Sequence, residues 1–145
     1  MSTAPPAPSH APAYGAFLAR GFLAWLLIAA LETLHGIARM LWLSPLLGDE
    51  LARRVAVPGG VLIVFLVAWL TVRWIGARST ARLLAVGALW LLLMVGFDIV
   101  LAQSLGFSWE RILADFDPRR GGLLGFGMAT MLVMPWLAAR LRGLR

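Results

Sequence analysis

Four long apolar segments, joined by connections that contain arginine, are the feature that most constrains the fold of this chain. They run approximately from Phe17 to Leu43, Val57 to Ile75, Leu83 to Phe107 and Gly122 to Leu141. A hydrocarbon core of about 30 Å needs about 20 helical residues to cross it, and each segment has about that length. The sequence therefore predicts four transmembrane helices.

The composition of the chain supports this prediction. Hydrophobic residues make up 61% of the sequence and charged residues 14%, with a mean hydropathy of +0.84. A soluble domain of 145 residues could not bury so much apolar surface. We expect an all-α integral membrane four-helix bundle over residues 14–145, preceded by a disordered tail rich in proline and alanine at residues 1–13.

Several function classes are excluded by what the sequence lacks. The chain has no cysteine, which rules out disulfides, thiolate metal sites and cysteine nucleophiles. Motifs for a Ser-His-Asp hydrolase, a phosphate-binding loop or a dinucleotide fold are also missing. The net charge of +6 comes from arginines that flank the apolar segments, so it indicates contact with a lipid bilayer and not with nucleic acid. No cofactor is expected.

The distribution of arginine predicts the orientation in the membrane. With a cytoplasmic N-terminus, that side carries Arg20, Arg73, Arg78, Arg82, Arg140, Arg142 and Arg145, and the opposite side carries Arg53, Arg54, Arg111, Arg119 and Arg120. The margin of seven to five favours cytoplasmic termini, since positive charge accumulates on the cytoplasmic side. All five acidic loop residues fall on the other side.

The connection between the third and fourth segments predicts a short amphipathic helix. It begins with the capping residue Ser108 and ends before Pro118, and its apolar side chains share one face, namely Trp109, Ile112, Leu113 and Phe116. Such a helix is expected to lie in the membrane interface. The pair Ser44 and Pro45 similarly predicts a short helix after the first span.

Ionisable residues inside the first and third segments are the candidate functional site. Glu32, His35 and Arg39 are spaced by three and then four residues, which places them on one stripe of a helix. They lie about 16, 21 and 27 Å into the first helix, and Asp98 lies about 22 Å into the third, at the depth of His35. We expect all four to share one buried polar cluster in the half of the bundle away from the N-terminus, with the first and third helices lining the interior.

This cluster has two interpretations. In the first, Arg39 and a protonated His35 neutralise Glu32 and Asp98 and lock two helices together. In the second, the cluster is a site for a ligand, a proton or a metal. The Glu-x-x-His spacing occurs in di-metal bundles, but a single copy of it is too few ligands, so no metal site is predicted. The methionines at 128, 131 and 134 are expected to pack in the core.

Two stretches carry a resemblance to a known family. They are Glu32-Thr33-Leu34-His35-Gly36-Ile37-Ala38-Arg39 and the run from Ser108 to Gly122, which reads SWERILADFDPRRGG. Together they resemble an uncharacterised family of small four-span bacterial inner-membrane proteins. The resemblance covers most of the chain after the tail. It implies a bacterial inner membrane and four spans, and it implies no activity.

Three functions therefore remain open at the level of the sequence. The chain is expected to be a non-enzymatic accessory or structural subunit, docked on a larger membrane complex or on its own copies as a homo-oligomer. Alternatively, it is a small transporter or channel that uses the polar cluster as a proton or cation site. A third alternative is an intramembrane enzyme built on the same residues.

Overall fold

The structure is a computed structural model that describes residues 14–144. Every regular element in that range is a helix, which confirms the all-α prediction. The elements are α1 (Tyr14–Ala38), the π-helix η1 (Arg39–Leu43), α2 (Ser44–Leu47), α3 (Asp49–Ile75), α4 (Thr80–Ser104), α5 (Trp109–Phe116), the 3₁₀-helix η2 (Pro118–Arg120) and α6 (Leu124–Leu141). The predicted tail at residues 1–13 lies outside the described residues.

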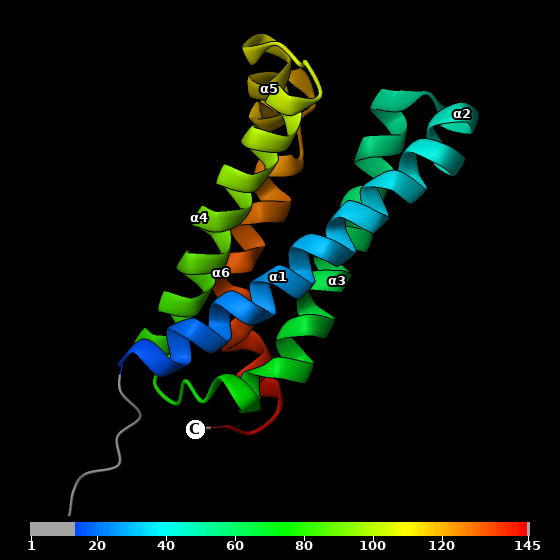
Figure 1. The fold of residues 1–145 in the computed structure, drawn as a ribbon. Helices are drawn as coiled ribbons and strands as arrows, with labels where there is room; N and C mark the ends of the chain where they lie inside the picture. The colour runs from blue at the N-terminus through cyan, green and yellow to red at the C-terminus, as the bar shows by residue number, and fades with distance from the viewer. Residues whose placement is uncertain (1–13, 145) are drawn as a thin grey trace, which may run out of the picture.

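Four helical segments are long and apolar enough to cross a membrane. They are Gly15–Leu47, which joins α1, η1 and α2, and then α3, α4 and α6. The chain is therefore a multi-pass helical bundle, as predicted. Figure 1 shows the two ends of this bundle. The start of α1, the α3–α4 connection and the end of α6 form one end, here called the terminal end, and α2 and α5 form the other, here called the loop end.

The helix α6 has a more central position than the sequence suggested. It packs along α4 and also along α3, whereas α1 packs on α3 and, over a shorter stretch, on α4. We expected the first and third helices to line the interior, and the structure shows that α6 lines it as well. Its methionines Met128, Met131 and Met134 are buried, which confirms their predicted role in core packing.

The apolar core fills the terminal half and the middle of the bundle. Its largest fully buried side chain is Trp90 of α4, whose indole nitrogen donates a hydrogen bond of 2.8 Å to the carbonyl oxygen of Gly21 in α1. Near the loop end, the buried apolar residues of the described chain are Ala52, Ala56 and Ile112, and they lie outside this core. The loop end therefore depends on other contacts.

A glycine permits the closest approach of α4 and α6. A Cβ atom added to Gly87 would overlap the backbone of Leu132, with the carbonyl oxygen as its nearest neighbour. Backbone atoms cannot move aside as a flexible side chain can, so a larger residue at this position would force the two helices apart. On the same helix, a Cβ atom at Gly96 would meet no atom within 4 Å.

We therefore predict that Gly87→Ala destabilises the protein by about 1–3 kcal/mol, the usual cost of overpacking. Gly96→Ala is the matched control and should be neutral or slightly stabilising, because alanine is the better helix former. Thermal melting in detergent measures both. Equal melting temperatures for the two variants would contradict the close contact between α4 and α6.

Candidate functional site

Two glycines of α3 make room for the ionisable side chains of α1. A Cβ atom at Gly60 would lie 3.1 Å from a carboxylate oxygen of Glu32, and a Cβ atom at Gly59 would lie 2.7 Å from Cε1 of His35. Glu32 and His35 occupy one stripe of α1 because they are three residues apart. The sequence Gly59-Gly60 thus forms a shallow backbone surface on which both side chains rest.

The imidazole of His35 is fixed by a hydrogen bond across the α1–α3 contact. Its Nε2 lies 3.0 Å from the carbonyl oxygen of Ala56. A carbonyl can only accept, so Nε2 must carry the hydrogen and donate it. In neutral His35 the second nitrogen, Nδ1, is therefore unprotonated, and it is the atom of this ring that can take up a further proton.

Asp98 reaches the same region from α4. Its carboxylate is close enough to Glu32 for the two negative charges to interact, and Glu32 interacts in turn with His35. Asp98 also lines a cavity of about 40 Å³ beneath α5, together with Arg111 and Asp115. That volume is large enough for a water molecule. The structure thus brings together Glu32, His35 and Asp98 in the half of the bundle that contains α5.

Arg39, the fourth predicted member of the cluster, lies elsewhere. Its Nη1 forms an ion pair of 3.1 Å with Asp49, and it pairs with neither Glu32 nor Asp98. Gly48 adopts a left-handed backbone (φ +78°) that reverses the chain and brings the first residue of α3 beside Arg39. The long arginine side chain then reaches outward to that carboxylate and avoids the apolar interior. The prediction of one cluster with four members was wrong in this respect.

The burial of the cluster also differs from the expectation. Glu32, His35 and Asp98 are each half-buried, and none of the polar side chains in the described chain is fully buried. Figure 1 shows the reason, since α1 runs obliquely and diverges from α4 toward the loop end. The three side chains are therefore partly accessible in the single chain. The prediction of a buried cluster was wrong for this reason.

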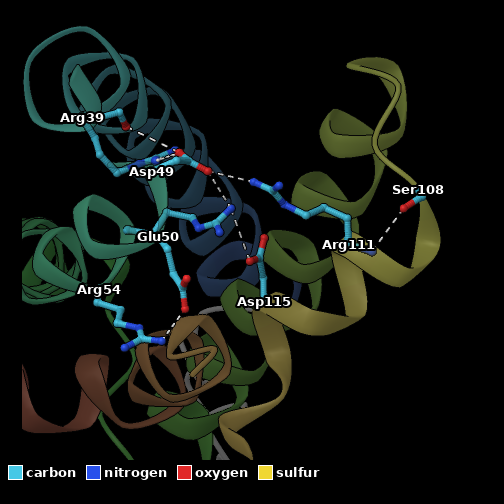
Figure 2. Close-up of polar contacts among 9 residues, drawn as sticks. Arg39, Asp49, Glu50, Arg54, Ser108, Arg111 and Asp115 are labelled. Carbon is cyan, nitrogen blue, oxygen red and sulfur yellow. Dashed lines mark hydrogen bonds and ion pairs between the residues drawn. The ribbon is translucent and has the colours of Figure 1, made fainter. Parts of the chain in front are cut away.

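The strongest polar centre of the structure surrounds Asp49 and was not predicted. Three guanidinium groups converge on its carboxylate, as Figure 2 shows in part. The distances from Asp49 are 3.1 Å to Arg39, 3.1 Å to Arg53 and 2.9 Å to Arg111. Arg53 also pairs with Asp115 at 3.6 Å. We call these five residues the Asp49 hub.

The hub joins three elements that are distant in sequence. Arg39 comes from η1, Asp49 and Arg53 come from α3, and Arg111 comes from α5. The spacing of four between Asp49 and Arg53 is a visible helix signal for an ion pair. The pairing with Arg111 crosses 62 positions of the sequence, so no local pattern could have indicated it.

The helix α5 forms where the sequence predicted it. Ser108 caps it, since its hydroxyl oxygen accepts a hydrogen bond of 3.3 Å from the backbone nitrogen of Arg111. The predicted apolar face divides in two. Ile112 is buried and Phe116 is half-buried against the bundle, while Trp109 and Leu113 remain exposed. The position of this helix in a membrane interface stays a prediction.

These contacts predict losses of stability of different size for two carboxylate substitutions. Asp49→Asn weakens three ion pairs at once and should destabilise the protein by about 1 kcal/mol, because exposed ion pairs are individually weak. Asp98→Asn should reduce the stability by less. Asp98 has no ion pair among the described residues, and the substitution removes the repulsion between its charge and that of Glu32. Thermal melting in detergent compares them, with Glu110→Gln as an exposed control. A larger loss for Asp98→Asn would show that this carboxylate has a cationic partner.

The described residues contain no group of three histidine, aspartate or glutamate side chains placed to hold a metal ion. Glu32, His35 and Asp98 therefore approach one another without forming a ligand set. A comparison with protein-family models, curated proteins and solved structures found no match to this chain.

Proposed function

We propose that this chain is a non-enzymatic multi-pass protein of a bacterial inner membrane that binds a proton at Glu32, His35 and Asp98. One observation carries the proposal. Arg39 is held by Asp49, and as a result neither Glu32 nor Asp98 forms an ion pair with an arginine in the part of the chain that the structure describes. Such an arrangement attracts positive charge.

The physical argument rests on the low dielectric constant of the surroundings. Two negative charges repel strongly where the dielectric constant is low, and at this position the surroundings of the helices are proposed to be hydrocarbon. A proton bound by one carboxylate removes one of the charges.

A proton fits the site better than a metal or an organic solute does. The three side chains do not converge as metal ligands do, and the cavity beside Asp98 has a volume of about 40 Å³, which suits water. Because that cavity lies beneath α5, protons would reach Asp98 from the loop end. A small proton transporter or channel would use the same proton-binding site.

The half-exposed state of the cluster favours a second candidate function. Ionisable side chains at membrane depth are normally covered by protein or by water. Glu32, His35 and Asp98 are partly exposed in the single chain, so a partner subunit or a second copy of the chain would complete their surroundings. The protein would then be an accessory subunit of a larger membrane complex. Copurification from native membranes distinguishes this candidate, since a subunit brings its complex.

Both termini are proposed to be cytoplasmic. Four spans place the start of α1 and the end of α6 at the same end of the bundle, as Figure 1 shows. By sequence position, seven of the thirteen arginines belong to this end, and the five acidic residues of the connections all belong to the other end. Positive charge of this kind marks the cytoplasmic side of a bilayer.

Infrared difference spectroscopy tests the proton site. The wild-type protein in nanodiscs should show a carboxylic-acid band that responds to pH and is shielded from solvent. We expect this band to disappear in the double variant Glu32→Gln/Asp98→Asn, because both proton-binding carboxylates are removed. The matched control Glu110→Gln/Asp117→Asn removes the same two residue types from the surface of the loop end and should keep the band. An unchanged band in the first variant would refute the proposal.

Reporter fusions test the orientation. We expect a fluorescent protein fused after Arg145 to be bright in cells and alkaline phosphatase at the same place to be inactive, because the phosphatase folds only outside the cytoplasm. A fusion within the 105–108 connection should give the reverse pattern. Active phosphatase at Arg145 would overturn the proposed orientation.

A further inference from the structure

The terminal end of the bundle is strongly positive and contains no acidic side chain. Its arginines in the described chain lie at the start of α1, around the α3–α4 connection and at the end of α6. Apart from Arg82, whose guanidinium lies 5.6 Å from the ring centre of Phe17, they are Arg20, Arg73, Arg78, Arg140 and Arg142. The seven acidic residues of the sequence are the two of the polar cluster and five at the loop end. No aspartate or glutamate is therefore near enough to neutralise these arginines.

The loop end has nearly the same number of arginines but a different electrostatic character. Six arginines there face five carboxylates, which leaves a surplus of one positive charge. Five of the six form ion pairs, as in the Asp49 hub and in the pair of Arg54 with Glu50 at 2.5 Å, and Arg119 is the exception. The two ends therefore have similar numbers of arginines. Because most loop-end arginines pair with carboxylates, the net positive charge is larger at the terminal end.

Aromatic rings and backbone carbonyls position the terminal arginines without neutralising them. The guanidinium of Arg20 lies 5.8 Å from the ring centre of Trp74 and donates a hydrogen bond of 2.9 Å to the carbonyl oxygen of the same residue. Arg142 lies 5.4 Å from the ring of Trp69 and donates to its carbonyl oxygen, and Arg140 lies 5.2 Å from the ring of Trp136. These rings and carbonyls hold the cations at the helix ends with their full charge.

We propose that this arginine belt, defined as Arg20, Arg73, Arg78, Arg140 and Arg142, binds the headgroups of anionic phospholipids. A guanidinium presents a fork of N–H donors that matches two oxygens of a phosphate. Tryptophan prefers the headgroup level of a bilayer, which places the rings of the belt at that depth. Arg20, Arg73, Arg78 and Arg140 are exposed and can contact a lipid surface directly. The loop end, with five of its six arginines in ion pairs, binds such lipids weakly.

Tryptophan fluorescence offers a direct test, since Trp69, Trp74 and Trp136 lie beside arginines of the belt and report on lipid there. The protein is placed in vesicles of phosphatidylcholine with a small share of brominated lipid, which quenches nearby tryptophans. Quenching by brominated phosphatidylglycerol should exceed quenching by brominated phosphatidylcholine in the wild type and should fall as salt is added. In Arg73→Gln/Arg78→Gln the preference for phosphatidylglycerol should fall by about fivefold for each arginine that contacts a headgroup.

The matched control is Arg119→Gln/Arg120→Gln, which removes two exposed arginines from the loop end. It should keep the wild-type preference. The proposal is refuted if the wild type shows no preference, or if both double variants lose it equally. A preference that soluble glycerol phosphate abolishes would identify a site for a free phosphate compound and would refute the assignment to a lipid. Arg140→Gln repeats the test should the first variant fail to fold.

Discussion

The close approach of α4 and α6 at Gly87 is the contact on which the packing of the bundle depends. Backbone meets backbone there, so the spacing of the two helices is fixed by atoms that cannot adjust. With α6 held against α4, the buried methionines of α6 join the core, and Trp90, three residues beyond Gly87 in α4, donates a hydrogen bond to Gly21 of α1. The apolar core forms around this arrangement in the terminal half and the middle of the bundle.

The loop end is organised by charge, because the apolar core does not extend to it. The Asp49 hub ties η1, α3 and α5 together through side chains that are partly exposed to the surroundings. Glu32, His35 and Asp98 lie between these two regions, below the hub and at the edge of the core. The packed helices of the core therefore lie on one side of these three residues. The ion pairs of the Asp49 hub, which are weaker and sensitive to salt, lie on the other side.

The position of the Arg39 guanidinium decides how the cluster of Glu32, His35 and Asp98 is interpreted. If Arg39 neutralised Glu32 and Asp98, the cluster would be a structural ion-pair network. The ion pair with Asp49 removes it from that role and leaves two carboxylates facing one histidine. Charge is arranged differently at the terminal end, where Arg20, Arg140 and Arg142 contact aromatic rings or backbone carbonyls and no carboxylate. The two ends of one small bundle thus use arginine in opposite ways.

The sequence by itself determined the all-α class, the four spans and the short helix after Ser108, because length, hydropathy and capping are local properties. It also placed Glu32 and His35 on one stripe, since a helix fixes that spacing. Only the tertiary structure decided that Gly48 turns Asp49 toward Arg39 and that Arg111 joins them across 62 positions. Which ion pairs form depends on where the helices lie in space. Carboxylates on α1, α3 and α4 were all possible partners for the guanidinium of Arg39. Spacing along a chain states which partners are possible, and packing selects among them.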